Sequence, residues 1–574
     1  MKKENLAIIS LAILLTASSI VNVILEIRIN GRSPVSKNVL KVGKAETAAP
    51  AVLDPVDSWD SISNDMIRHV CDTLFVYDLT DPALPLIMRV ATNYSWNIGL
   101  DELTVSLRSD VWFHDGVKFN ATAVKFTFDR LTYFMNVSGT LPKTSHVCDP
   151  FYLFLDMNKD PILNRTEIID EYTVRFILNK PNGVFISLLS DEASSILHPK
   201  STPATEYLEF AEEDILVGTG PFEYNPIIFG EELRFTRFDL YWGLATFWEE
   251  IIWVFYPDAT TASYAMLEQN FDYLGSPLTS LIPEFQADED IVVVEMNTST
   301  IFRYWSLNNR KINNTYVRKA IAYAYNYTYF IKEIRQGFAI KAEQFLPPGF
   351  PHYNSSFNAP YYNTAIARQA MMTAFPTETA AAGVTAEAVG VNPTNDALWQ
   401  GLTLATYDVL KYPGYTTGIM MNEAFRQDME QIGIVIVPDH PCWDPWWGWD
   451  WGCDYDEDKL EIFYSGWRPD YIDPFNMLEP LLNNLSSNHL RNNDYLIHKW
   501  LKQYEETDPT NITGRSKLIY KIQQRAINEL YLLIPLGFDH TLYVHHRSLG
   551  GVSYNIQRNL WLTDSYFIPG ISKA

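Results

Sequence analysis

The stretch LRSDVWFHDGVKFNATAVKFTFDRL, residues 107–131, decides the fold of this chain. Its first residue closes a strand, and an exposed loop follows with His114, Asp115 and Gly116 at its tip. Gly116 supplies the positive backbone angle that a tight turn requires. Asn120 then starts a helix, because its side-chain oxygen can accept a hydrogen bond from an unpaired backbone N–H of the first turn. The stretch therefore predicts a strand, a turn and a helix joined in an α/β protein.

These residues resemble the signature of the family 5 extracytoplasmic solute-binding proteins, the peptide- and nickel-binding components of ABC importers. Further segments resemble that family in the same order along the chain: LDPVDSWD (53–60), DTLFVYD (72–78), VGTGPFEYNP (217–226), DLYWG (239–243), SLNNRKINNTYVRKAIAYAYNY (306–327), FLPPGFPHYN (345–354), WRPDYIDPFNML (467–478) and YKIQQRAINELYLLIPL (520–536). The resemblance runs from about residue 40 to about residue 545.

The resemblance implies an α/β, two-lobed periplasmic-binding-protein-like fold (type II, cluster C) with an extra subdomain. Length agrees with this, because 574 residues are too many for one hydrophobic core. The expected parts are an N-terminal anchor or signal segment with its linker (1–37), lobe I (38–69, 205–300 and 525–574), a subdomain that elaborates lobe I (70–204) and lobe II (301–524).

Residues 6–25, LAIISLAILLTASSIVNVIL, predict an N-terminal transmembrane helix. Twenty helical residues span about 30 Å, the thickness of the hydrocarbon core. Lys2 and Lys3 precede them and should stay in the cytoplasm. A cleaved signal peptide is the alternative, but its apolar stretch is normally shorter and no sharp small-x-small site follows. We expect a retained single-pass anchor with the body outside the cytoplasm.

The composition excludes several function classes. The net charge of −25 argues against nucleic acid, whose binding needs clustered Lys and Arg. It also argues against a body that lies on anionic lipid. The chain has no G-x-S-x-G, H-E-x-x-H or Walker motif, so an enzyme has no support and no cofactor is expected.

Cysteines and sequons fit an exported chain. Cys442 and Cys453 bracket a short loop and are expected to form a disulfide, with Cys71 paired to Cys148. A four-cysteine zinc site is disfavoured, because no C-x₂-C spacing occurs. A glycosylated surface is predicted by the N-x-[ST] sequons at Asn93, Asn120, Asn136, Asn164, Asn297, Asn313, Asn326, Asn354, Asn484 and Asn511.

Asp470 is the candidate ligand-binding residue. In peptide-binding members of the resembling family, an Asp just after Trp-x-x pairs with the ammonium of the peptide, and Asp470 follows Trp467 in that way. Trp467 would stack on the ligand backbone. Arg468-Pro469 departs from the small residues usual there, and Arg468 would compete for the carboxylate. The alternative is that Asp470 caps a turn before Pro474.

A tryptophan-rich loop at 443–451 is the second candidate region. Trp443 and Trp446 are expected to reach the cleft, because exposed aromatics can grip a ligand. A disulfide-closed mini-core is the alternative. The acidic run at 454–458 lacks the EF-hand spacing and is expected to be a solvated surface rather than a calcium site.

Periodicity predicts most elements between these sites. Strands are expected at 39–45, 233–238, 250–257, 402–408 and 459–467, and antiparallel strands around 103–113 and 172–179. Helices are expected after Asp258, over 315–337 and over 416–432, the last within a βαβ-like unit. The Ala-, Thr- and Gly-rich stretch 371–400 is expected to be an insertion or mobile loop.

The expected function is therefore an extracytoplasmic binding protein, a monomer, that delivers di- or oligopeptides to ABC permease subunits. An oligosaccharide is the second ligand class, prompted by the tryptophan loop, and nickel is the third, because no convincing His cluster is present. A surface sensor or adhesion module on the same fold is the competing function.

Overall fold

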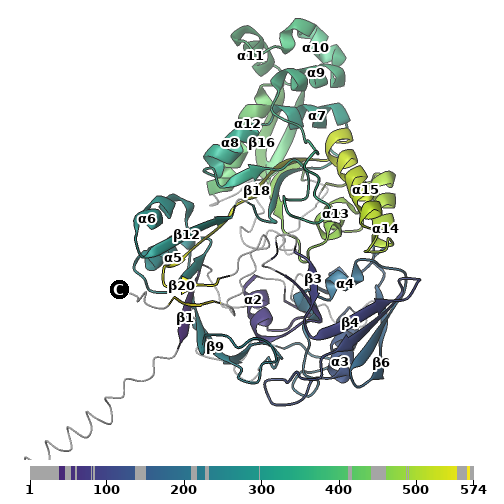
Figure 1. The fold of residues 1–574 in the computed structure, drawn as a ribbon. Helices are drawn as coiled ribbons and strands as arrows, with labels where there is room; N and C mark the ends of the chain where they lie inside the picture. Colours follow the sequence, from purple (N-terminus) through teal and green to yellow (C-terminus); the bar gives the residue numbers. More distant parts are fainter. Residues whose placement is uncertain are drawn as a thin grey trace, which may run out of the picture.

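The computed structural model describes residues 38–45, 53–58, 61–78, 81, 84–135, 150–208, 216–225, 232–296, 298–410, 416–440, 460–486, 488, 490–552 and 565–568. Within them the chain forms two lobes and a subdomain, each built on its own sheet (Figure 1).

Lobe I is built on a seven-stranded sheet in the order β12-β19-β11-β1-β10-β9-β8. Its strands are β1 (Val39–Lys44), β8 (Phe222–Asn225), β9 (Glu232–Arg237), β10 (Glu250–Phe255), β11 (Tyr273–Gly275), β12 (Ile291–Met296) and β19 (Thr541–His546). The first strand of the fold lies at the centre and pairs in parallel with β10 and β11. Helices α2 (Ser61–Val70), α5 (Ala259–Leu267) and α6 (Ile282–Ala287) cover the sheet. The strands predicted here are confirmed, as is the helix after Asp258, whose carboxylate accepts from the Thr261 N–H at 2.9 Å.

The subdomain holds an antiparallel sheet in the order β4-β5-β7-β6. The strands are β4 (Ala91–Trp96), β5 (Glu102–Leu107), β6 (Leu163–Asp170) and β7 (Thr173–Leu178). Helix α3 (Ala121–Phe134) packs on it, and Asn120 caps α3 by accepting from the Thr122 N–H at 2.9 Å. Gly116 has a φ of +79°, so the predicted turn, cap and helix are confirmed. Shorter elements are β2 (Phe75–Tyr77), β3 (Leu86–Met88), α4 (Phe185–Leu188) and the 3₁₀ turns η1 (Pro150–Phe154) and η2 (Glu192–Ser194).

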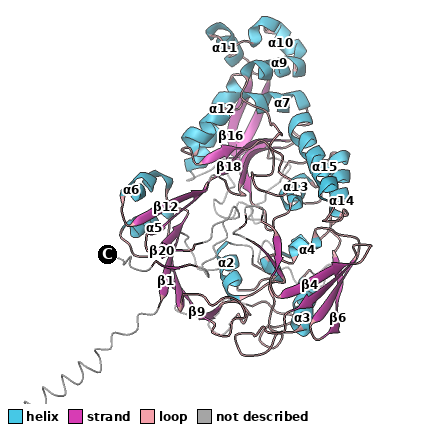
Figure 2. Cartoon of the chain, viewed as in Figure 1, coloured by secondary structure: helices cyan, strands magenta, loops and turns pink. Residues whose placement is uncertain are grey.

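Lobe II is built on a six-stranded sheet in the order β14-β18-β13-β17-β15-β16. Its strands are β13 (Phe302–Leu307), β14 (Ala339–Lys341), β15 (Ala405–Leu410), β16 (Ile434–His440), β17 (Ile462–Trp467) and β18 (Leu533–Asp539). Because β15 and β16 are parallel and joined by α12 (Thr416–Glu430), the predicted βαβ unit is confirmed. Figure 2 shows further helices around this sheet: α7 (Thr315–Ala324), α9 (Thr364–Ala374), α13 (Pro474–Leu482), α14 (Tyr495–Glu505) and α15 (Ile512–Gln523).

Two predictions for lobe II are wrong. The stretch 371–400 is not a loop: it forms the end of α9, then α10 (Pro376–Ala381) and α11 (Pro393–Gln400), held by Trp399, which is fully buried and donates to the Ala388 carbonyl at 2.9 Å. The single helix expected over 315–337 is broken after α7. There the Asn326 N–H donates to Asp428 Oδ2 at 2.8 Å, and the Asn326 side chain caps the short helix α8 (Tyr327–Tyr329).

The boundary expected at residue 525 is also displaced. β18 pairs with β13 and β14 in lobe II, so the chain returns to lobe I only at β19. β18 is buried along its whole length, as a central strand requires. The chain thus crosses between the two large sheets from β12 to β13 and from β18 to β19, and we call these two crossings the hinge. Ion pairs lie there: Arg303 Nε and Arg335 Nε bind Asp539 at 2.9 and 3.0 Å, and His540 pairs with Glu295.

Several predictions concern residues outside the described part of the chain. These are the segment 6–25, Cys148, the expected Cys442–Cys453 disulfide, the tryptophan-rich loop 443–451 and the acidic run 454–458. Cys71 is a buried free thiol, so the expected Cys71–Cys148 bond is not formed in this structure. Among the described residues, no helix is long and apolar enough to cross a membrane.

Candidate ligand-binding site between the lobes

The segment that follows β17 carries the candidate site. The Trp467 indole N–H donates to the Asn476 carbonyl at 2.8 Å, and the Asp470 N–H donates to Asn476 Oδ1 at 2.7 Å. Asn476 lies in the first turn of α13 and so fixes this segment from both sides. Trp467 is half-buried against the hydrophobic core.

Within the described part of the chain, one oxygen of the Asp470 carboxylate lacks a hydrogen-bond donor. Its Oδ2 is buried and has no hydrogen-bond partner among the described residues. Burial raises the pKa of Asp470 to about 6, although Asn476 and the Arg468 charge act in the opposite direction. A buried carboxylate oxygen without a donor costs free energy, and a ligand cation would remove that cost.

The alternative role of Asp470 as a turn cap belongs to Asp473 instead. Asp473 caps α13 by accepting from the Phe475 N–H at 2.8 Å. The same carboxylate accepts from the Tyr504 hydroxyl at 2.9 Å and pairs with Arg515 at 3.1 Å. Asp470 is therefore not needed to cap this helix, and its side chain is available for another purpose.

Two further carboxylates face this place from the subdomain. Asp191 and Glu192 stand at the start of η2, and Glu192 accepts from Arg68 Nε of α2 at 2.7 Å. The pKa of Asp191 is raised well above its ordinary value by burial, then by the charges of Glu192 and Asp470. The Tyr77 hydroxyl donates to the Ile472 carbonyl at 3.2 Å and joins the subdomain to the Asp470 segment.

Sequence reasoning missed Asp191 and Glu192, because nothing in the local pattern shows that they meet a segment far along the chain. Asp470 and Trp467 both bond to Asn476, whereas Trp443 and Trp446 lie outside the described residues. In the described ranges no group of three or more His, Cys, Asp or Glu side chains could hold a metal ion. The site is thus a junction of lobe I, subdomain and lobe II at which three carboxyl groups, those of Asp191, Glu192 and Asp470, lie near one another.

Comparison with known proteins assigns the chain to a family. The family model described as "Bacterial extracellular solute-binding proteins, family 5 Middle" matches residues 86–489. The dipeptide-binding protein of Escherichia coli (strain K12) is 27% identical over 45% of this chain, and that alignment spans half of the relative's own length. The glutathione-binding protein GsiB of the same organism is 24% identical over 87% of this chain and 89% of GsiB.

A solved structure agrees with the fold. The periplasmic binding protein DppA from Helicobacter pylori, in complex with the peptide STSA, superposes with a TM-score of 0.70 at 20% identity and covers 92% of this chain and 98% of DppA. The two-lobed α/β architecture is therefore confirmed. The chain belongs to the family 5 extracellular solute-binding proteins, a family of binding proteins rather than enzymes.

Proposed function

We propose that this protein binds peptides between its two lobes and delivers them to the permease subunits of an ABC importer. The observation that carries the proposal is the buried Asp470 Oδ2 without a donor, at the junction of the lobes. The names of the dipeptide-binding relative and of the peptide-bound DppA support a peptide as the ligand. A peptide that binds the closed form more tightly than the open form would then raise the population of the closed form.

In this proposal Asp470 receives the N-terminal ammonium of the peptide. A charge-assisted hydrogen bond in a desolvated site contributes roughly 1.5–3 kcal/mol. Trp467 is already fixed by its bond to Asn476, so its ring can offer a rigid apolar face to the ligand backbone. Besides burial, the nearby Glu192 and Asp470 charges raise the pKa of Asp191, and a bound cation would lower that pKa again.

The test compares ligands and variants on the full-length protein. A thermal-shift screen of di- to pentapeptides, neutral oligosaccharides and nickel salts comes first, because a ligand that binds only the folded form raises the melting temperature. Calorimetry then measures each peptide hit with a free and with an acetylated N-terminus.

Asp470→Asn should weaken the free peptide about tenfold to more than a hundredfold. The acetylated peptide should bind the wild type poorly and lose little more in the variant, as coupling between two groups in direct contact requires. The exposed Asp239 serves as control, and Asp239→Asn should bind like the wild type. If a peptide binds Asp470→Asn with the affinity that it has for the wild type, the assignment of Asp470 to the site is wrong. If only oligosaccharides raise the melting temperature, the peptide proposal is wrong.

The oligosaccharide alternative was based on Trp443 and Trp446, which lie outside the described residues, so the structure gives it no argument. We also propose that residues 6–25 are retained as an anchor, supported by their length, their apolar character and the two preceding lysines. Intact-mass analysis of the native protein tests this, and a mature chain that starts after residue 25 would rule it out.

A further inference from the structure

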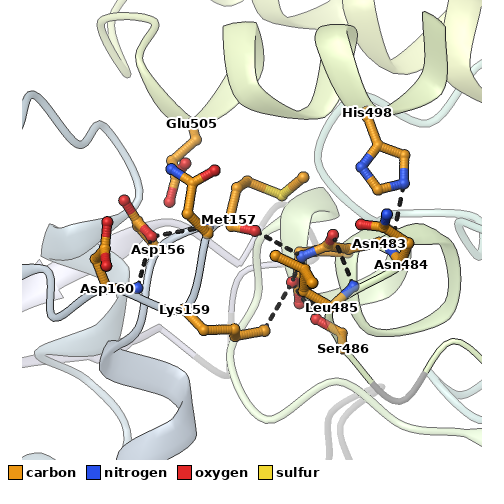
Figure 3. Close-up of polar contacts among 12 residues, drawn as sticks. Asp156, Met157, Lys159, Asp160, Asn483, Asn484, Leu485, Ser486, His498 and Glu505 are labelled. Atoms are coloured by element: carbon orange, nitrogen blue, oxygen red, sulfur yellow. Dashed lines mark hydrogen bonds and ion pairs between the residues drawn. The ribbon is translucent and has the colours of Figure 1, made fainter. Parts of the chain in front are cut away.

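A second contact joins the subdomain to lobe II at the end of α14. The Gly183 N–H donates to the Glu505 carbonyl at 2.7 Å, and the Asn182 side chain donates to Glu505 Oε1 at 3.1 Å. Beside it, Asn483 donates to the Met157 carbonyl at 3.0 Å, and Lys159 pairs with Glu479 at 3.0 Å. Figure 3 shows the subdomain loop with Asp156, Met157, Lys159 and Asp160 facing the residues of lobe II.

This contact lies far from the hinge. The hinge lies where β12 and β18 leave their sheets, whereas α14 meets the subdomain near α4 on the other side of the molecule (Figure 1). Rotation of the lobes about the hinge moves the far side most. A contact at this place would form when the lobes close and separate when they open.

Gly183 is required by the packing of the subdomain against lobe II and not by its own backbone conformation. It is not among the glycines with positive φ. A Cβ built on Gly183 would lie 2.2 Å from the Thr507 carbonyl oxygen and 3.3 Å from Pro509 Cδ, both in lobe II. The first of these atoms belongs to the backbone and cannot turn away, so a larger residue at 183 conflicts with closure alone.

Glu505 is the sensitive group in the contact, since its side chain is only 4% exposed. Burial raises the pKa of Glu505 to about 8, and the Asp156 charge acts in the same direction. The nearest cations are occupied: Lys180 binds Asp156 and Asp160 at 2.8 and 2.9 Å, and Lys159 binds Glu479. The charged groups that face Glu505 are Asp156 and Lys180 in the subdomain, Glu479 on α13, and Lys502 and Glu506 at the end of α14.

We propose that Gly183, Asn182 and Glu505 form a closing latch between the subdomain and lobe II, and that the latch is stronger when Glu505 is protonated. The proposal needs only the two-lobed fold and holds for any ligand. In the open form Glu505 loses the cover of the subdomain and ionises as an ordinary carboxyl group near pH 4.3.

The direction of the pH effect follows from the two protonation states. The closed form binds a proton on Glu505 up to about pH 8, whereas the open form releases it near its ordinary pKa. Closure is therefore fully favoured below the ordinary pKa. It weakens by up to about tenfold per pH unit as the pH rises toward 8, and stays constant above it.

The first test uses hydrogen–deuterium exchange on the full-length protein, read in peptides covering 179–189 and 500–508. Gly183→Ala should raise exchange in both peptides at least about tenfold, because the closed population is lost. Gly390 is the matched control, since a Cβ there has nothing nearer than 3.9 Å, and Gly390→Ala should exchange like the wild type. Wild-type protection in Gly183→Ala, or exchange in the wild type as slow as in the β5 and β7 strands, would overturn the latch.

The second test isolates the proton. Glu505→Gln keeps an acceptor for Asn182 but cannot ionise. The exchange rates of the variant and the wild type are compared at the same pH, which removes the pH dependence of the intrinsic rate. In the two peptides the variant should exchange as fast as the wild type near pH 5 and more slowly than the wild type near pH 8.5. If the ratio of the Glu505→Gln exchange rate to the wild-type exchange rate is the same at both pH values, the protonation dependence is refuted. This holds even if Gly183→Ala behaves as expected.

Discussion

At the residue scale, a fully buried ion pair of Asp54 and Arg130 joins lobe I to the subdomain. Both side chains are 0% exposed. Arg130 also donates to the carbonyls of Pro203 and Glu206 at 2.8 and 2.7 Å, while Asp54 Oδ2 accepts from the Leu208 N–H at 2.8 Å. Each charge is thus satisfied by several bonds, and removal of one partner leaves the other buried and uncompensated.

Asp54→Ala should therefore destabilise the protein by about 3–5 kcal/mol. The measurement is the shift of thermal unfolding. The control is the exposed pair of Arg108 and Asp110, which lies 2.7 Å apart, and Asp110→Ala should cost less than about 1 kcal/mol. Equal shifts for the two variants would show that burial does not set the strength of these pairs.

At the element scale, helix α3 depends on its cap. Asn120 is extended at φ −159° and accepts from the Thr122 N–H, so Asn120→Ala should cost about 1 kcal/mol. Asn120 is also a sequon, and Asn120→Asp separates the two roles because Asp caps equally well and cannot carry a glycan. Thermal unfolding of both variants decides it: a destabilised Asn120→Asp would mean that the cap alone does not explain the position.

The elements show why some predictions succeeded. Caps such as Asn120 and Asp258 act on backbone groups two or three residues away, so the local sequence contains the whole interaction. The helices within 371–400 carried the same kind of signal, since Asn392 caps α11 and Pro376 and Pro393 stand in first turns. The Ala-, Thr- and Gly-rich composition is therefore a poorer guide to this stretch than its capping residue and its first-turn prolines.

Other features could not be read from local sequence. β18 is buried throughout and has no charged residue before Asp539, so it would suit either large sheet, and its place in lobe II depends on pairing with β13 and β14. The meeting of Asp191 with Asp470 depends in the same way on how the subdomain packs on lobe II. Asp470 is predicted through family resemblance, and its buried Oδ2 without a donor supports its proposed role as the partner of a ligand cation.

At the scale of the whole molecule, Asp470 and Glu505 should act on ligand affinity in opposite directions. A bound ammonium needs Asp470 ionised, so affinity should rise with pH up to about 6 and then level off. Closure needs Glu505 protonated, so its contribution should fall as pH rises toward 8.

Calorimetry of a bound peptide from pH 4 to 9 should therefore show affinity declining above about pH 6 in the wild type. The affinity of Glu505→Gln should instead rise to about pH 6 and stay level until the peptide ammonium loses its own proton at about pH 8, whereas the affinity of Asp470→Asn should already decline below about pH 6. A wild-type affinity that is constant from pH 6 to 8 would contradict the coupling of closure to binding.

The close approach of Gly183 to the Thr507 carbonyl, as part of the proposed closing contact, would also limit the length of the peptide that the protein binds tightly. Because two backbones meet there, the proposed closing contact would hold the lobes at one fixed separation for every solute between them. A peptide that fits within that separation gains the whole contribution of the contact. A longer peptide props the lobes apart and gains none of it, so affinity should drop at one threshold of chain length rather than decline gradually.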